Sequence, residues 1–342
     1  MICPHCSRNL LQRERTRRTC TFCRKPFALD PKLDGAGLSD LRIRRIAEKI
    51  TGNGQLTCTI EQLGYATEPR GQRPAEASQA AYAGCCAGAA GLLLLLAAVL
   101  HNTVSLALLI ATALILVVAR YAARESAKSG GALAVNPRWG RGKFADVMVA
   151  RWREVYGTLP AGVIEEERVP YGPPADGAAF ALLCPDRTAA AFLRANGYLE
   201  RYRARHVGLV HDLPDDLPVV VLHDASARGY RLVADARAKQ PGRRVLDAGL
   251  SPVLVLDRPD AHVQLRDPAR AVRWEPTAAG VLPKLTREET NWFAQGWWSP
   301  LAAVPPKRLM AVAVKAAELA VAAPATRPPL DAAEADRRRA AA

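Results

Sequence analysis

The sequence lacks three features that would point directly to an activity. It has no Gly-rich phosphate loop of either common nucleotide-binding type. It has no Ser or Cys nucleophile in a recognisable setting beside its histidines, so no catalytic triad is predicted. Its first residues are cysteines and arginines without an apolar core, so we expect no cleavable signal peptide. The sequence therefore indicates neither a nucleotide-binding protein with such a loop, nor an enzyme with a catalytic triad, nor a protein with a cleavable signal peptide.

Charge is also absent from one long stretch of the chain. No Asp, Glu, Lys or Arg occurs between Ala80 and Ala119. As one helix, this stretch would measure about 60 Å, twice the roughly 30 Å hydrocarbon core of a bilayer. The polar pair His101-Asn102 divides it into two apolar halves of about 20 residues each. We therefore predict a transmembrane helical hairpin over residues 80–122, with the lipid bilayer as a partner.

Positive charge surrounds this stretch and is missing from its predicted turn. The net charge is +14, and residues 1–79 hold 14 Lys or Arg against 8 Asp or Glu. The positive-inside rule then predicts a cell-membrane protein with two spans and both termini in the cytoplasm. Gly84 and Gly88 form a G-x-x-x-G pattern, which suits either packing within the hairpin or a homodimer.

Two pairs of cysteines near the N-terminus have the spacing of a metal site. Cys3 and Cys6, followed by Cys20 and Cys23, form the pattern C-x2-C-x13-C-x2-C. Each pair can turn as a knuckle that places two thiolates on one ion, and two knuckles complete a tetrahedral zinc site. With Lys25-Pro26-Phe27 after the second pair, residues 1–30 resemble the zinc ribbon family. The resemblance implies a closed, structural Zn²⁺ site on the four cysteines; redox dithiols are the alternative.

Four arginines lie between the two cysteine pairs. Arg13, Arg15, Arg17 and Arg18 are diluted only by Glu14. Such a run can bind the phosphates of a nucleic acid, or it can form the solvated edge of a hairpin. No aromatic residue interleaves with it to stack on a base. Nucleic acid and a protein partner both remain open as predictions.

Composition and turn signals divide the chain into units. Ser39 is a predicted N-cap, with Leu41, Ile46 and Ile50 on one face of the helix that follows. The predicted units are the zinc ribbon at 1–30, a small helical module at 31–66, a linker at 67–79, the transmembrane hairpin at 80–122, a basic connector at 123–142, a cytoplasmic α/β domain at 143–322 and a disordered tail at 323–342.

The predicted α/β domain alternates short apolar strands with helices. Strands are expected within 178–183, 207–210, 217–222, 245–246 and 253–256, and helices within 188–195 and 227–239. This alternation indicates a mainly parallel, Rossmann-like sheet. The fold class is therefore multidomain, with a zinc ribbon, a transmembrane hairpin and an α/β domain.

Three of the predicted strands are followed by an aspartate. In parallel sheets ligands collect beyond the carboxyl ends of the strands. If Asp186, Asp224 and Asp247 converge there, with His223 nearby, they would suit Mg²⁺ and a phosphorylated or nucleic-acid substrate. Aspartates that cap helices are the alternative.

The segment around Asp224 also resembles a known motif. Residues 219–229, VVVLHDASARG, are similar to the second motif of the Toprim fold, in which a strand ends in D-x-D before a glycine and a helix. Ser226 stands in place of the second aspartate, and Cys184 stands where the catalytic glutamate would be. The resemblance therefore implies a relative in fold without the catalysis. We interpret the chain as a non-enzymatic regulatory or assembly protein, with the metal-dependent enzyme and the nucleic-acid binder as alternatives.

Overall fold

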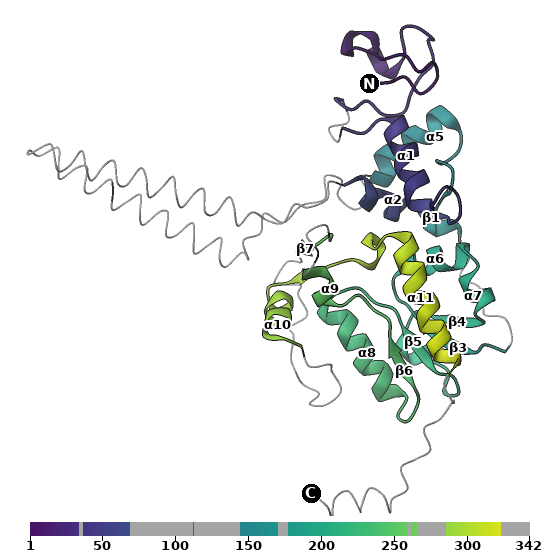
Figure 1. Ribbon diagram of the computed structural model, residues 1–342, viewed down its shortest axis with the longest axis vertical. Helices are drawn as coiled ribbons and strands as arrows, with labels where there is room; N and C mark the ends of the chain where they lie inside the picture. The colour runs from purple at the N-terminus through teal and green to yellow at the C-terminus, as the bar shows by residue number, and fades with distance from the viewer. Residues whose placement is uncertain are drawn as a thin grey trace, which may run out of the picture.

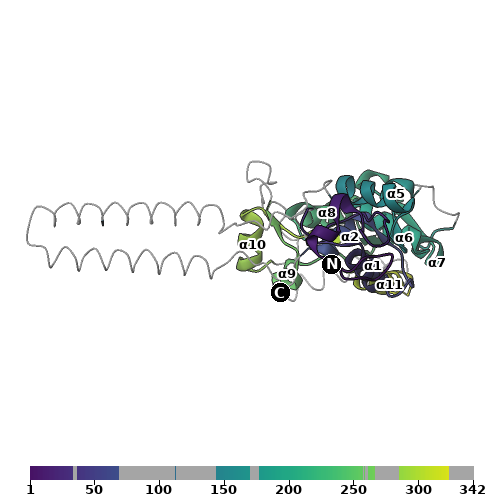
Figure 2. The ribbon, with the colours of Figure 1, turned by 90° about the horizontal axis from the view of Figure 1, so that it is seen from above.

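In Figure 1, the computed structural model has three bodies one above another: the residues with the paired cysteines, a helical module and an α/β domain. Seen from above, the first two lie over the third (Figure 2). The structure describes residues 1–33, 37–68, 112, 144–169, 177–256, 258, 261–265 and 285–322. Most of the predicted linker, the whole of the predicted connector and the predicted tail lie outside these residues.

The helical module is assembled from two distant parts of the chain. The first supplies α1 (Asp40–Thr51), β1 (Cys58–Thr59) and α2 (Ile60–Thr67). The second supplies the π-helix η3 (Phe144–Val149), α5 (Ala150–Tyr156) and β2 (Val163–Ile164). Strands β1 and β2 pair in parallel. Ile43, Leu63, Met148 and Trp152 share one buried core, so neither part could bury its apolar face without the other.

The predicted parallel sheet is present. It contains β3 (Phe180–Leu183), β4 (Ala204–Val207), β5 (Val219–Val221) and β6 (Val245–Asp247). The strand order is β4-β3-β5-β6, and every neighbouring pair is parallel. The chain therefore winds outward in both directions from β3 and β5, which places the switch point of the sheet between these two strands.

Helices cover both faces of the sheet because its central strands are apolar on both sides. Phe180, Leu182 and Val220 pack with α6 (Arg187–Ala195), α7 (Tyr198–Arg201) and α11 (Pro306–Val321). Ala181, Leu183 and Val221 pack on the opposite face with α8 (Ala227–Lys239). Figure 1 shows α8 and α11 on opposite sides of the strands. The remaining described elements are η1 (Gln12–Glu14), η2 (Thr16–Arg18), η4 (Glu166–Arg168), η5 (Val210–Asp212), α9 (Pro252–Leu256), β7 (Gln264–Leu265), α10 (Arg287–Ala294), β8 (Trp297–Trp298) and η6 (Leu301–Ala303).

One predicted strand is a helix. Residues 253–256 were expected to extend the sheet, and they form α9 instead. Pro252 supplies the first residue of this helix, a position where its missing amide has no cost. Val253 and Leu254 remain exposed while Val255 is buried. The apolar run therefore reflects one buried contact in a short helix, and it does not reflect a buried strand.

The predicted transmembrane hairpin is not supported, and the membrane part of the fold class is corrected. In the part of the chain that the structure describes, no helix is both long enough and apolar enough to cross a bilayer. The longest described helix, α11, has 16 residues, or about 24 Å at ~1.5 Å per residue. The hairpin at residues 80–122, with Gly84 and Gly88, lies outside the described residues apart from Thr112.

The predictions that depended on the hairpin are corrected with it. These are the two-span placement in the cell membrane and the cytoplasmic position of both termini. Their physical weakness is that a lack of charge identifies an apolar segment, whereas a span also needs a continuous helix of about 20 residues. Composition does not supply that continuity.

The module joins the α/β domain through two polar contacts to helix α6. Asn196 accepts a hydrogen bond from the Thr57 amide at 2.8 Å and donates one to the Thr57 carbonyl at 3.0 Å. Thr188, in the first turn of α6, donates to the Glu61 carboxylate at 2.7 Å. These contacts hold both ends of α6 against the module.

Asn196→Ala should lower the free energy of unfolding by about 1–3 kcal/mol, because it leaves the Thr57 amide and carbonyl without their partners. Urea denaturation followed by circular dichroism measures this change. Gln55→Ala, at an exposed position in the same loop, is the control and should change the value by less than about 0.5 kcal/mol. Equal effects of the two substitutions would contradict the assignment.

Candidate functional site: a four-cysteine metal centre

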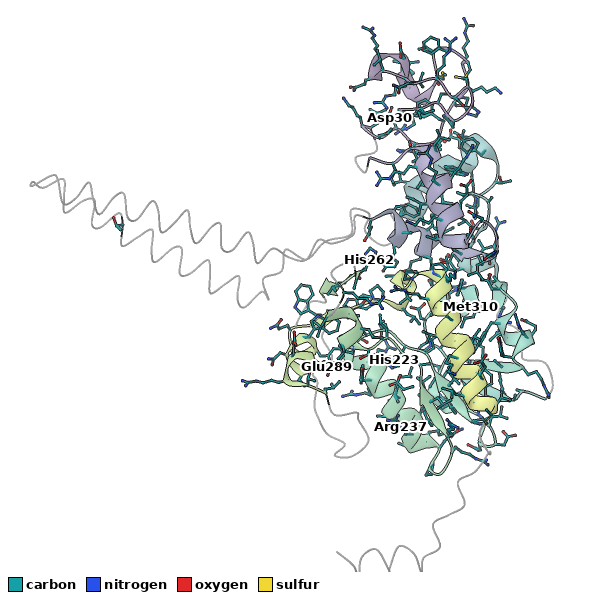
Figure 3. All side chains as sticks on the ribbon, in the orientation of Figure 1. Asp30, His223, Arg237, His262, Glu289 and Met310 are labelled. Atoms are coloured by element: carbon teal, nitrogen blue, oxygen red, sulfur yellow. The ribbon has the colours of Figure 1, made fainter. Side chains whose placement is uncertain are left out.

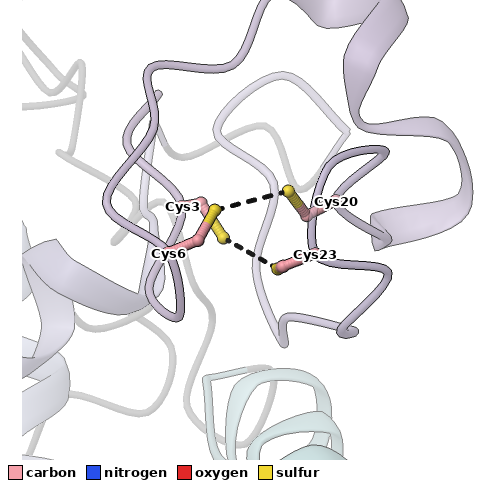
Figure 4. A group of neighbouring side chains, drawn as sticks. All are labelled: Cys3, Cys6, Cys20 and Cys23. Carbon is pink, nitrogen blue, oxygen red and sulfur yellow. Dashed lines mark hydrogen bonds between the residues drawn. The ribbon is translucent and has the colours of Figure 1, made fainter.

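The four N-terminal cysteines converge on one point. Their sulfur atoms all lie within 4.8 Å of one another. Cys3 Sγ is 3.8 Å from Cys23 Sγ, and Cys6 Sγ is 3.8 Å from Cys20 Sγ (Figure 4). These distances are far longer than the ~2.05 Å of a disulfide bond, and all four cysteines are free. The group can hold a metal ion, as the sequence spacing predicted.

The two knuckles repeat the same backbone structure 17 residues apart. In the first, the Ser7 amide donates to the Cys3 carbonyl and the Cys3 amide to the Arg8 carbonyl. In the second, Arg24 donates to Cys20, and Cys20 donates to Lys25. Ser7 and Arg24, the residues after each knuckle, both have positive φ, at 58° and 56°. This shared turn brings both thiols of each pair to the same side of the chain.

The backbone also stabilises thiolate charge. Burial alone would raise the pKa of Cys20, but the amides of Cys23 and Phe22, together with the Cys23 and Cys3 side chains, lower it to about 7. The His5 amide donates to Cys3 Sγ at 3.4 Å in the equivalent position of the first knuckle. At Cys3, however, burial outweighs the Cys6 and His5 amides and raises the pKa of the thiol. Thiolate is the form that binds a metal, so the amides favour the metal-binding form at Cys20.

Two buried side chains form the core of the ribbon, and one buried carboxylate connects the ribbon to the module. Leu10 and Phe27, equivalent positions in the two knuckles, pack beside Cys3 and Cys20. The Asp40 carboxylate is fully buried at the start of α1. It accepts hydrogen bonds from the amides of Ala28 and Leu29 at 2.9 and 2.8 Å. It also accepts one from the Tyr156 hydroxyl of α5.

The arginines between the knuckles have different environments. Arg15 is 6% exposed and forms an ion pair with Asp30, 3.3 Å from Nε to Oδ2. Asp30 lies where the ribbon meets the module (Figure 3). Arg13 and Arg17 are exposed, and Arg18 is partly buried. Arg15, one of the four arginines predicted to contact phosphate, is therefore buried and paired with a carboxylate of the protein itself.

His5 lies inside the first knuckle without joining the sulfur cluster. Its Nε2 is 2.8 Å from the Pro26 carbonyl oxygen, and its ring centroid is 5.9 Å from that of Tyr156. This side of the first knuckle therefore faces helix α5.

The three strand-end aspartates each have a local partner. Asp186 caps α6 by accepting from the Ala189 amide at 2.9 Å. Asp224 accepts from the Ser226 hydroxyl at 2.6 Å. Asp247 accepts from His223 Nε2 at 3.0 Å and from the Gly249 amide at 2.9 Å. Among the described residues, the only group of three or more potential metal ligands is the set of four cysteines, so the geometry offers no shared Mg²⁺ site on these carboxylates.

His223 is the centre of this second polar cluster, and its role is structural. It is 3% exposed and lies within the α/β domain (Figure 3). Its Nδ1 is 2.7 Å from the Asp224 carbonyl oxygen, and its Nε2 contacts the Asp247 carboxylate. Both ring nitrogens are therefore engaged, one by a backbone carbonyl oxygen and the other by a carboxylate. A histidine bound in this way has no free nitrogen to act as a general base.

Two glycines that sequence reasoning missed make room for His223. A Cβ added to Gly249 would lie 2.2 Å from His223 Nε2, and one added to Gly229 would lie 2.4 Å from the Asp224 carbonyl oxygen. Gly229 lies in the first turn of α8, where glycine has a lower helix propensity than alanine. A glycine within a predicted helical segment was the sequence signal that could have identified this position. Such a glycine indicates that another group approaches the backbone too closely for a side chain.

The chain itself occupies the carboxyl edge of the sheet. Ala225, just beyond β5, forms a bridge with Ser299, and η6, which follows Ser299, packs against α2 of the module. Cys184, at the end of β3, is fully buried, and burial raises the pKa of its thiol. A buried neutral thiol is a poor nucleophile. At the switch point, where such sheets take ligands, this protein therefore has internal contacts.

Comparison with known proteins gives no relative for this chain. No family model matches it, and neither a curated protein nor a solved structure matches at the level of significance applied.

Asp40→Ala should lower the free energy of unfolding by about 2–4 kcal/mol, because it leaves two buried amides and a tyrosine hydroxyl without their acceptor. Chemical denaturation followed by tryptophan fluorescence measures this loss. Asp216→Ala, at an exposed position, is the control. A loss of similar size in both variants would show that Asp40 does not join the ribbon to the module.

Asp247→Asn should be most destabilising near neutral pH. Burial alone would raise the pKa of Asp247, but the hydrogen bond and charge of His223, the Gly249 amide and the charge of Arg237 lower it below its ordinary value. The carboxylate therefore contributes stability above its unfolded-state pKa, and this stability is lost as the pH falls through the lowered pKa.

Thermal unfolding of both forms between neutral and acidic pH measures this dependence. The difference in unfolding free energy should be about 1–3 kcal/mol at neutral pH and should vanish in acid. Asp235→Asn, at an exposed position on α8, should show no such trend. A difference for Asp247→Asn that stays constant with pH would contradict the ion pair.

Proposed function

We propose that the protein is a zinc-dependent regulatory or assembly protein whose metal has a structural role. Tetrahedral zinc with Zn–S bonds of about 2.3 Å requires sulfur–sulfur edges of about 3.8 Å. Two sulfur pairs of the cluster, Cys3 with Cys23 and Cys6 with Cys20, are both 3.8 Å apart. This agreement is the observation that carries the proposal. Four thiolates complete the coordination of zinc and leave no position for a substrate or a reactive water.

The metal would hold together a unit that has little other core. The buried apolar side chains of the ribbon are Leu10 and Phe27, together with the buried cysteines. A core of this size does not fold alone without a metal or disulfides. Bound zinc would fix the two knuckles, and the Asp40 contacts would fix them in turn against α1 and α5.

The α/β domain is proposed to support interactions without catalysis. Its strand-end aspartates are engaged locally, both ring nitrogens of its His223 have partners, and its Cys184 is buried. The contacts of α2 with η6 and of Glu61 with Thr188 connect it to the module. These observations favour a scaffold that presents the ribbon to a partner.

The purified protein should contain one zinc ion per chain, measured by elemental analysis. Cys6→Ser should remove most of it, because three thiolates and a neutral hydroxyl bind zinc much more weakly than four thiolates. Cys58→Ala is the matched control: Cys58 is a buried cysteine in the core of the module and should leave the zinc content unchanged.

Metal substitution gives a second readout of the same site. Co²⁺ added to the metal-free protein should produce the absorption of a tetrahedral tetrathiolate centre, and Cys6→Ser should abolish it. Protein that binds neither metal and instead forms reversible disulfides between the cysteines would replace this proposal with the redox alternative.

A further inference from the structure

The ribbon presents an excess of positive charge to solvent. Residues 1–33 contain eight Lys or Arg and two acidic residues. Both acidic side chains have internal partners: Asp30 pairs with Arg15, and Glu14 accepts from the Leu11 amide at 2.8 Å. The exposed basic side chains of the ribbon are Arg8, Arg13, Arg17, Arg24, Lys25 and Lys32.

An exposed aromatic ring lies among these charges. Phe22, in the second knuckle, is 48% exposed. The guanidinium carbon of Arg8, which follows the first knuckle, lies 4.5 Å from the centre of its ring. Phe22 and Arg8 thus form one platform built from both knuckles.

The two knuckles place the aromatic rings at their equivalent positions in different surroundings. Phe22 and His5 occupy equivalent positions, 17 residues apart, in the two knuckles. His5 faces the module, where its ring lies 5.9 Å from that of Tyr156. Phe22 is on the other knuckle and packs against Arg8 instead. An apolar ring kept half in water beside a guanidinium is suited to a ligand that brings its own flat, apolar face.

We propose that this surface binds single-stranded nucleic acid, with one unpaired base stacked on Phe22 and the phosphates contacted by Arg8, Lys25 and their basic neighbours. Stacking on an aromatic ring needs an unstacked base, which a single strand supplies and a duplex does not. An acidic protein would satisfy the charge but would leave Phe22 unexplained. This inference rests on the proposed zinc site, because the metal holds the two knuckles that form the platform.

Binding of a fluorescent oligodeoxythymidine to the zinc-loaded, full-length protein, followed by anisotropy, tests the proposal. Phe22→Ala should weaken binding about tenfold, the range expected for loss of one base stack. Phe22→Trp should retain binding. Leu33→Ala, which removes another exposed apolar side chain just after the ribbon, is the control and should have no effect.

Salt dependence separates the phosphate contacts from the stacking contact. Lys25→Gln should reduce the slope of log affinity against log salt by about 0.7, the value for one phosphate contact on a single strand. Phe22→Ala should leave the slope unchanged. Lys239→Gln, at an exposed position at the end of α8, controls for the loss of one positive charge elsewhere.

Competition with a duplex of the same length and with polyglutamate identifies the class of partner. The proposal requires the single strand to compete best. Equal competition by duplex or polyglutamate, together with unchanged binding by Phe22→Ala, would overturn it, as would the absence of binding. Zinc content measured on the same preparations distinguishes this failure from failure of the metal site, because neither Phe22 nor Lys25 supplies a ligand to the sulfur cluster.

Discussion

The buried carboxylate of Asp40 is the constraint on which the N-terminal half of the structure depends. It lies at the start of α1 and accepts from the Ala28 and Leu29 amides and from Tyr156 of α5. Two of these donors come from the end of the ribbon and one comes from α5 in the second part of the module, while Asp40 itself belongs to the first part. A buried carboxylate is tolerated only when such donors replace its water. The same interaction therefore satisfies the charge and sets the position of the ribbon.

The second constraint is the set of contacts at the carboxyl edge of the sheet, where the α/β domain meets the module. In many doubly wound proteins the carboxyl edge at the switch point is open to a ligand. Here Ala225 is bridged to Ser299, η6 packs against α2, and Glu61 binds Thr188 at the start of α6. The carboxyl edge at the switch point is therefore occupied by contacts of the chain itself.

Sequence patterns predicted features whose chemistry is local. Two residues between paired cysteines are enough to form a knuckle, so Cys3, Cys6, Cys20 and Cys23 could be assigned as a metal group without the fold. The apolar runs of β3 and β5 predicted a parallel sheet, because a strand buried on both faces is apolar throughout and does not alternate with polar residues. The same reasoning was wrong for residues 253–256, where one buried valine in the helix α9 gives a similar apolar run. The membrane hairpin was predicted from the length of an uncharged stretch, its central polar pair and the flanking positive charge, and no helix among the described residues supports it.

The sequence by itself determined the metal-binding residues, the parallel sheet and the basic character of the ribbon, because each depends on neighbouring residues or on composition. Only the tertiary structure decided which charges are free. Arg15 is paired with Asp30, and Asp247 with His223, through contacts between residues 15 and 24 positions apart. Equivalent positions in the two knuckles also received different roles, since His5 faces α5 while Phe22 packs against Arg8. The physical reason is that burial and pairing depend on which surfaces meet, and that information is not present in any single stretch of the chain.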